Sequence, residues 1–315
     1  MKLFLKTSVI LLFGSFFFAC DKVDDPIPEN AGQSFQLDDS TEYISDPVFG
    51  FQSASDLRDF IENNTWTEKT APNNLTQRFV LLEEYTGHTC PNCPAASKEI
   101  ERLDSLFGNQ LISVAIHTGN FAATFPPSFG KYTTDFTDED NFGEDYAALF
   151  NTSTVGYPSG IVNRVGGTVT KKDTWENLIR AYTNDSPKAS LALKTYFSSD
   201  VNAVRIQLDV NWLADLSEDY NISVYLIESD IIDWQKNGGT DIEFYSHKHV
   251  LRKVVNDAFG KDLKDAVSGD TESIQYITPL NSSWNASNMN VVAFIFNNDQ
   301  SSFEVIQANS VYINK

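Results

Sequence analysis

Two apolar runs with a helical pattern between them lie within residues 78–116. The run inside Arg78–Tyr85 is continuous, which is typical of a strand buried on both faces. From Pro91 to Phe107 apolar residues recur on one helical face, and the pattern stops at Gly108. Leu111–Ile116 is a second continuous run. A strand, a helix and a strand in so short a span predict a βαβ unit with parallel strands.

The segment between this unit and residue 187 mixes short apolar stretches with an aromatic-rich loop. We expect an irregular loop over Asn120–Asn141, a short helix at Tyr146–Phe150, strands near Gly160–Val165 and Thr168–Lys171, and a closing helix at Thr174–Tyr182. Two interpretations of the loop stay open. It is a lid or partner-binding surface, or a loop that its own Phe side chains pack onto the core.

After Pro187 the apolar pattern changes to a period of two. Apolar and polar residues alternate from Val204 to Trp212, which predicts a half-buried antiparallel strand. Further strands are expected at Ala189–Phe197, Ile222–Ile227, Val291–Phe296 and Phe303–Ile313. The predicted C-terminal region is therefore all-β, an antiparallel, Ig-like sandwich.

The first residues predict export to the cell envelope. Lys2 and Lys6 give the N-terminal end a positive charge. The apolar run that follows, Val9–Phe18, is too short to span a bilayer, and this combination is typical of a signal peptide. The run ends in Ala19-Cys20. A small residue followed at once by Cys resembles a bacterial lipobox, which implies that Cys20 is lipidated and holds the protein on a membrane.

The residues that follow carry little apolar patterning. From Asp21 to about Ser45 the chain is acidic and polar, which predicts a flexible tether, and helical spacing within Ser55–Trp66 predicts one short helix. The predicted organisation is a signal peptide at 1–19, a lipid-anchored tether with that helix at 20–75, an α/β domain at 76–186 and a β-sandwich domain at 187–315.

Composition narrows the range of partners. The 315-residue chain has a formal net charge of −20, and 41% of its residues are hydrophobic, which is sufficient for a sizeable core. A phosphate backbone would be repelled by this charge, so we expect no nucleic-acid partner. We expect no cofactor and no resident metal.

The candidate chemistry lies at Cys90 and Cys93, a Cys-x-x-Cys pair at the start of the predicted helix. The unpaired N–H groups and the dipole of a helix N-terminus favour the thiolate of the first Cys, and the second, one turn on, can resolve a mixed disulfide. With Cys20 assigned to lipid, the other two of the three cysteines form this pair. The pattern favours thiol–disulfide exchange. Two alternatives stay open: a structural disulfide that never turns over, and a zinc site completed by His88 or His117.

The histidines have weaker functional interpretations. His88, beside the pair, would stabilise a thiolate or lie exposed in its loop, and His117 at a strand end is more often structural. His247 and His249 are two residues apart, so on a strand they would face one side as a metal pair does. With no third ligand in sight, a structural role is favoured for both.

From residue 78 to 184 the sequence resembles the thioredoxin-like superfamily. Glu84 lies six places before Cys90, where thioredoxins have a buried carboxylate, and Tyr157-Pro158 precedes a strand, as their cis-proline does. The resemblance implies that Cys90 attacks, Cys93 resolves, Glu84 takes the proton of the second cysteine, and Pro158 positions the substrate backbone. We expect Cys90 to be exposed, Cys93 buried and Pro158 beside them.

The sequence departs from thioredoxins next to the cysteines. Thr89 stands where they have Trp, and the central pair is Pro91-Asn92 rather than Gly-Pro. Because the central pair tunes redox potential, the resemblance does not imply a direction of electron flow.

Longer strings narrow the resemblance. Leu82–Pro94, Val114–Gly119 and His247–Arg252 are similar to the outer-membrane lipoprotein family named for a twenty-eight-kilodalton outer-membrane protein, which pairs a thioredoxin-like domain with a C-terminal β domain. This implies a lipid-anchored protein of the bacterial outer membrane, facing the periplasm or the outside. We expect mixed disulfides with other exported or envelope proteins. The rival hypothesis is an adhesin-like binding lipoprotein whose thioredoxin-like domain is a non-catalytic scaffold.

Overall fold

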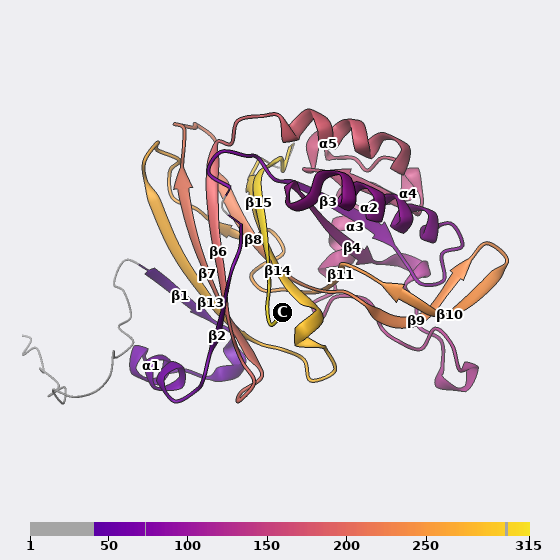
Figure 1. The fold of residues 1–315 in the computed structure, drawn as a ribbon, viewed down its shortest axis with the longest axis horizontal. Coiled ribbons are helices and arrows are strands. Elements are labelled where there is room, and N and C mark those ends of the chain that lie inside the picture. The colour runs from indigo at the N-terminus through magenta and orange to yellow at the C-terminus, as the bar shows by residue number, and fades with distance from the viewer. Residues whose placement is uncertain (1–40, 73, 300–301) are drawn as a thin grey trace, which may run out of the picture. The chain divides into compact units, whose positions relative to one another are not determined.

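The computed structural model describes residues 41–72, 74–299 and 302–315, which belong to one compact unit, Gln36–Lys315 (Figure 1). Within these residues the fold is a mixed α/β fold whose strands form three sheets. The predicted signal peptide, Cys20 and the tether as far as residue 40 lie outside the described residues. None of the helices in the described ranges has the length and apolar composition needed to cross a membrane.

The helices and strands keep the labels of Figure 1. The helices are α1 (Ala54–Glu62), α2 (Cys93–Phe107), α3 (Phe142–Leu149), α4 (Thr152–Val155) and α5 (Trp175–Thr183). The strands are β1 (Thr41–Ser45), β2 (Thr67–Thr70), β3 (Val80–Thr86), β4 (Leu111–His117), β5 (Ser159–Val162), β6 (Ala189–Ser198), β7 (Ala203–Trp212), β8 (Tyr220–Glu228), β9 (Ile231–Asn237), β10 (Thr240–His247), β11 (Val250–Val254), β12 (Lys261–Asp262), β13 (Thr271–Pro279), β14 (Met289–Asn297) and β15 (Val305–Tyr312).

The predicted βαβ unit is confirmed. β3 and β4 pair in parallel, from Val80 opposite Leu111 to Thr86 opposite His117, and every residue of both strands is buried. α2 connects them and ends at Gly108, whose φ of 55° lies in the region that glycine adopts most readily. β5 pairs antiparallel with β3 on its other side.

The largest sheet joins strands from before and after residue 187. Its order is β15-β14-β8-β11-β4-β3-β5, with β12 beside β8. The junction is the parallel pair of β11 and β4, where Val250 lies opposite Ala115 and the Ala115 N–H donates to the His249 carbonyl at 2.7 Å. The α/β region and the later strands are therefore one continuous hydrogen-bonded sheet.

Three buried apolar clusters hold the layers together. α2 and α5 cover one face of β3 through Ile100, Leu103 and Trp175. α3 and the opposite face of β3 and β4 form a second cluster, which continues onto β8 and β14. The third lies between the five-stranded sheet β1-β13-β7-β6-β2 and the remaining faces of β8, β14 and β15. The strict alternation of β8 explains its double role, since Tyr225 lies in one cluster and Val224 in another.

Some predicted elements are wrong. The last residues of the predicted tether, Thr41–Ser45, form β1, which pairs in parallel with β13. The strand expected at Thr168–Lys171 is a single bridge between Thr170 and Gly160, because Lys171 already leads into α5. The sequence patterns also missed the strands β9 to β13.

A buried ion pair ties β3 to the segment after β5. Arg164 donates through Nε and Nη2 to the two carboxylate oxygens of Glu83, each at 2.8 Å, and Nη2 also donates to the Tyr225 hydroxyl at 2.8 Å. Both charged side chains are almost completely enclosed, and the guanidinium lies over the rings of Tyr146 and Phe294. This pairing satisfies two charges that would otherwise strongly oppose burial.

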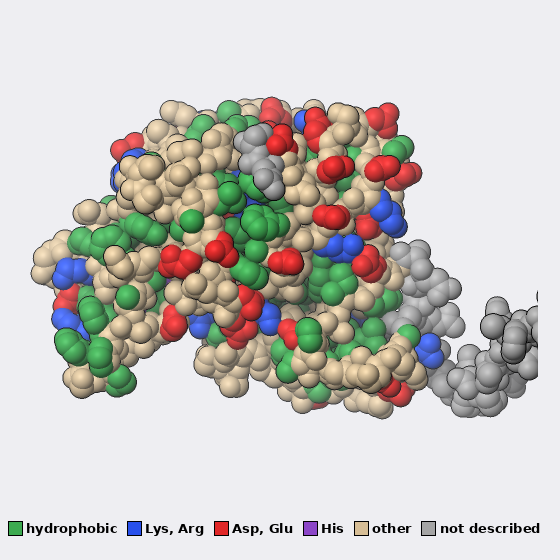
Figure 2. All heavy atoms as spheres, turned by 180° about the vertical axis from the view of Figure 1, so that it is seen from behind, with side chains coloured by type: hydrophobic (Ala, Val, Ile, Leu, Met, Phe, Trp, Pro, Cys, Tyr) green, Lys and Arg blue, Asp and Glu red, His purple; other side chains and the backbone are tan. Residues whose placement is uncertain are grey.

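Figure 2 shows Asp and Glu side chains spread over the face seen from behind, with fewer Lys and Arg among them. The whole chain has 43 acidic and 23 basic residues, so this distribution follows the composition.

Candidate functional site

Cys90 and Cys93 form a disulfide where the loop after β3 enters α2. Cys93 is the first residue of the helix, and the Cα atoms of the pair are 5.4 Å apart. The Cys90 N–H donates to the Gly87 carbonyl at 3.1 Å, so the loop between β3 and the helix is a tight turn. The predicted placement of the pair at a strand–helix junction is thus what the structure has.

Both cysteines are buried, which contradicts the expected exposure of Cys90. Each is only 1% exposed. The prediction considered only the local strand–loop–helix, in which the first cysteine lies at the surface of the turn. Two segments distant in sequence cover it here: the aromatic-rich loop after β4 and the β9–β10 hairpin.

The aromatic-rich loop closes one side of the Cys90 turn. The Phe121 carbonyl accepts from the Thr89 N–H at 3.1 Å and from the Thr89 hydroxyl at 2.9 Å, and a ring nitrogen of His88 lies 3.0 Å from the Ala123 carbonyl. A Cβ at Gly87 would lie 2.4 Å from the Phe121 backbone. Only glycine allows so close an approach.

The β9–β10 hairpin, Ile231–His247, closes another side. Its backbone N–H groups at Lys236 and Gly238 donate to the carbonyls of His88 and Pro91, both at 2.8 Å. The buried Gln235 amide donates to the Cys90 carbonyl at 3.1 Å. Residues on both sides of Cys90 are therefore paired with the hairpin.

The loop and the hairpin are also tied to each other. Asp241 on β10 accepts hydrogen bonds from Lys131 and from the Tyr132 hydroxyl, the latter at 2.6 Å. Thr134 donates to Asp233 on β9. The two covering segments thus form one polar assembly over the disulfide.

Glu84, the predicted proton acceptor, is fully buried on β3. Burial raises the pKa of its carboxyl to about 8, against a smaller lowering effect of the Thr86 hydrogen bond. Its Oε1 is enclosed and has no hydrogen-bond partner in the described part of the chain. A carboxyl with such a pKa exchanges protons near neutral pH.

Pro158 lies at the same end of β3 as the Cys90 turn. The Tyr157–Pro158 peptide bond is cis, and Ser159 begins β5 opposite Tyr85. The Tyr157 ring meets the ring of Phe121, with centroids 5.7 Å apart, so the loop contacts both Tyr157 and the Cys90 turn. Pro158 itself is half-buried.

All four histidines of the chain lie around this site. His88, His117 and His247 are buried, and their rings surround Phe136 with centroids 5.5, 5.0 and 4.4 Å from it. Burial lowers the pKa of each, to about 4 for His247 and well below the ordinary value for His117, where His247 and His88 lower it further. Burial thus disfavours the charged form of all three imidazoles, which argues against stabilisation of a thiolate by a His88 charge.

His247 and His249 do not share a strand face. His247 ends β10, whereas His249 has a φ of 56° and lies between β10 and β11. His249 instead pairs with Asp104 on α2, with its Nε2 3.1 Å from the carboxylate. Among the described residues, no three His, Cys, Asp or Glu side chains are grouped so that they could hold a metal ion.

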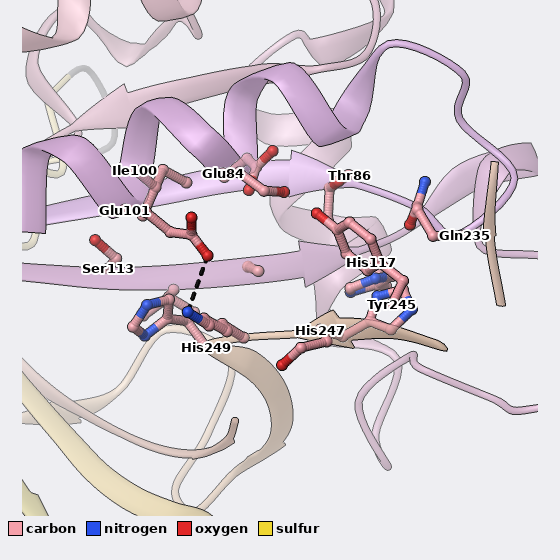
Figure 3. A pocket seen from close by; sticks show the side chains of 15 residues that line it. Glu84, Thr86, Ile100, Glu101, Ser113, His117, Gln235, Tyr245, His247 and His249 are labelled. Atoms are coloured by element: carbon pink, nitrogen blue, oxygen red, sulfur yellow. Dashed lines mark ion pairs between the residues drawn. The ribbon is translucent and has the colours of Figure 1, made fainter. Parts of the chain in front are cut away.

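A small polar cavity lies between β3, β4, α2 and the end of β10 (Figure 3). Its volume of about 30 Å³ is sufficient for a water molecule. Glu84 lines it from β3, and His117, Tyr245 and His247 line it from the opposite side. The unpartnered Glu84 Oε1 and His117 Nδ1 belong to these lining residues, which makes the cavity a suitable place for water.

Comparison with models of protein families shows which family this chain belongs to. The model of a family described as outer membrane protein Omp28 matches residues 144–315, more than half of the chain. The chain belongs to the Omp28 family. The family resemblance and the outer-membrane location predicted from the sequence are confirmed.

The Omp28 family model matches the C-terminal part of the chain, residues 144–315. It includes Pro158, the β9–β10 hairpin and the histidines 247 and 249, but it begins after Cys90, Cys93 and Glu84. Family membership therefore bears on the location of the protein and does not bear on the chemistry of the cysteines. A comparison with curated protein sequences finds no match.

Three solved structures are similar to this Omp28 family member to different extents. HBP35 of Porphyromonas gingivalis is similar with a TM-score of 0.56 and 16% identity, over 75% of this chain and 76% of that one. A protein of Agrobacterium tumefaciens has a TM-score of 0.48 and 12% identity, over 75% and 95% of the two chains. A domain of the outer membrane lipoprotein Omp28 of P. gingivalis has a TM-score of 0.29 and 23% identity, over 41% and 89%. Only the first has a TM-score above 0.5, so only it supports a shared fold. At 16% identity it supports nothing beyond the fold.

The sequence predictions missed the residues that cover the site. Gln235, Lys236 and Gly238 contact the Cys90 turn, and Asp241 ties the hairpin to the loop. A signal was present, since Gly238-Gly239 lies between residues of strand character, which is typical of a hairpin turn. Nothing local indicated where such a hairpin would dock.

Proposed function

We propose that this Omp28 family member exchanges disulfides with other exported proteins of the envelope, using Cys90 and Cys93 as its redox pair. The observation that carries the proposal is the disulfide at the N-terminus of α2, combined with the buried Glu84 carboxyl of raised pKa on the adjoining strand. A Cys-x-x-Cys bridge closes too small a loop to contribute much stability, so exchange is a better explanation of it than a structural staple.

The proposal includes a thioredoxin-like assignment for residues 76–186 and a sandwich for residues 187–315. The order of β3, α2 and β4, the antiparallel β5 and the closing α5 support the first assignment. The packing of the five-stranded sheet against β8, β14 and β15 supports the second. The shared sheet makes the two regions neighbours rather than separate bodies.

The exchange conserves electrons between two cysteine pairs. In the reduced protein the Cys90 thiolate attacks a substrate disulfide, forming a mixed disulfide and releasing one substrate thiolate. The Cys93 thiolate then attacks the Cys90 sulfur, which forms the Cys90–Cys93 disulfide and releases the second substrate thiolate. The substrate gains two electrons and the protein loses two. The reverse sequence oxidises a substrate dithiol.

Glu84 and Pro158 have supporting roles in this proposal. Cys93 must lose its proton before it attacks, and the Glu84 carboxylate is suited to accept that proton because its pKa of about 8 is near that of a thiol. Water in the adjoining cavity would carry the proton onward. Pro158, at the end of β3 where the turn lies, would contact the substrate backbone.

The rival function is a surface-binding lipoprotein whose α/β region is only a scaffold. The burial of both cysteines favours it, because a sulfur that no partner can reach does not exchange. The start of the family match after the cysteines is consistent with it as well.

Trapping separates the two functions. Cys93→Ser should accumulate discrete disulfide-linked partners on a non-reducing gel of the native envelope, because the resolving thiol is absent. Cys90→Ser combined with Cys93→Ser is the matched control and should trap none. Exchange is excluded if Cys93→Ser captures no protein and its Cys90 thiol titrates near the ordinary value of about 8.5.

We also propose that Cys20 carries the lipid. A small residue followed by Cys at the end of the apolar run supports this. Cys20→Ser should move the protein from the membrane fraction to the soluble fraction, measured by fractionation and blotting. Cys90→Ser, which leaves the anchor intact, should remain with the membrane. Retention of Cys20→Ser on membranes would contradict the assignment.

A further inference from the structure

The β9–β10 hairpin closes over the Cys90 turn with its backbone. We propose that this hairpin is a movable cover. It occupies the place of the substrate chain on the Cys90 turn, and its distal part swings away about a hinge at its base to allow exchange. The inference rests on the proposed exchange function and adds its regulation and the form of its substrate.

The hairpin contacts the turn through two backbone N–H groups and one side-chain amide. The Lys236 and Gly238 N–H groups donate to the His88 and Pro91 carbonyls at 2.8 Å, and the Gln235 amide donates to the Cys90 carbonyl. Donors two residues apart thus meet acceptors on both sides of the reactive cysteine. The backbone N–H groups of an extended substrate chain can make hydrogen bonds to the same carbonyls.

The hairpin is held as a separate element. β9 and β10 pair with each other in a two-stranded sheet of their own. Phe244 and Ile232 are 78% and 57% exposed, so much of its apolar surface faces solvent already. Isolated two-stranded hairpins are marginally stable, and elements with few buried apolar contacts open at a low free-energy cost.

The two ends of the hairpin have the features of a hinge. Asp230 and His249 flank it with φ values of 57° and 56°, a region that non-glycine residues adopt infrequently. Immediately after β10, Lys248 pairs with Glu101 at 2.9 Å and His249 pairs with Asp104, both on α2. The base is therefore anchored to α2, whereas the distal part is held on the turn by hydrogen bonds.

Opening has a consequence for the substrate. It exposes Cys90 and leaves the carbonyls of His88, Cys90 and Pro91 without the hairpin donors. An extended polypeptide with a cysteine can supply backbone N–H groups to those carbonyls, whereas a small thiol cannot. The cover thus favours unfolded or extended protein segments over small-molecule thiols as partners.

The test is the rate at which tris(2-carboxyethyl)phosphine reduces the disulfide of the full chain, followed by alkylation and mass spectrometry. The phosphine becomes its oxide with oxygen from water, and the disulfide gives two thiols. We expect the native protein to react much more slowly than the urea-unfolded chain. Asp241→Asn and Gln235→Ala should each accelerate reduction of the native protein by about tenfold. The first removes the charge that pairs with Lys131, and the second removes the amide that donates to the Cys90 carbonyl.

Phe244→Ser is the matched control. It alters the same hairpin at an exposed side chain and should leave the rate unchanged. Equal reduction of the native and unfolded chains would overturn the cover, as would native rates of Asp241→Asn and Gln235→Ala that equal the parent rate. Acceleration by Phe244→Ser would also overturn it, because the effect would then not depend on the contacts with the turn.

The reduction rates test the cover separately from the exchange function. A protein that is slow to reduce, is accelerated by these variants and traps no partner has the cover without the function. A protein that traps partners but is reduced as fast as its unfolded chain has the function without the cover.

Discussion

Replacing Arg164 with Met is expected to destabilise the protein by about 3–5 kcal/mol, because it leaves the Glu83 carboxylate buried without its partner. The Arg164 guanidinium donates twice to Glu83, and both side chains are enclosed between β3 and the aromatic rings on α3 and β14. A methionine fills similar volume but cannot donate. Urea unfolding, monitored by far-ultraviolet circular dichroism, measures the change.

Two further variants make this prediction specific. Arg180→Met removes an exposed pair with Glu176 and should change the free energy of unfolding by at most about 1 kcal/mol. Glu83→Leu combined with Arg164→Met removes both charges and should recover much of the lost stability. If Arg164→Met unfolds at the same urea concentration as the parent, the buried pair is not the constraint that its geometry indicates.

The second large effect is expected at Glu84 and depends on pH. Its folded-state pKa of about 8 is above the ordinary value of 4.5, so the folded protein binds this proton more tightly than the unfolded chain does. The stability that comes from the protonated carboxyl is complete below pH 4.5 and is lost as the pH rises toward 8. Glu84→Gln is neutral at every pH, so at pH 9 it should be more stable than the parent by on the order of 4 kcal/mol.

The comparison is a pair of urea titrations at pH 4.5 and pH 9. The two proteins should differ little at the lower pH and most at the higher one. Glu243→Gln, at an exposed position on β10, should follow the parent at both. A constant difference between parent and Glu84→Gln across this range would show that the buried carboxyl is not the group that titrates.

The same substitution should weaken exchange. Without a proton acceptor, resolution of the mixed disulfide by Cys93 should slow by about a hundredfold at pH 7, the size of a typical general-base contribution. A stopped-flow measurement with a fluorescent disulfide-linked peptide gives this rate. A more stable variant that is also slower indicates that Glu84 is retained for chemistry at the expense of stability.

The parts of the fold that sequence patterns predicted are those set by local signals. β3, α2 and β4 follow from two continuous apolar runs and an amphipathic helix that ends at Gly108. β7 follows from its alternation. β13, with the sequence Thr271–Pro279, was missed although it pairs along its length with β7, because its short apolar stretch is flanked by polar residues. Its strand conformation is stabilised by the neighbouring strand more than by its own composition.

The sequence predicted where the cysteine pair lies along the chain but not what covers it. The local pattern placed Cys90 and Cys93 at a strand–helix junction, whereas Glu84 was singled out only by the resemblance to thioredoxins. The burial of Cys90 depends on Gln235, which is 145 residues away in sequence. A pairing over such a distance is determined by the whole chain and leaves no pattern near the cysteines.

That separation along the chain also sets an order of events during export. Cys90 and Cys93 cross the membrane long before residues 231–247, which form their cover. Until those residues arrive, β4 lacks the partner that β11 provides, and the cysteine pair is open to any oxidant in the compartment. The disulfide can therefore form on the emerging chain before residues 231–247 enclose it.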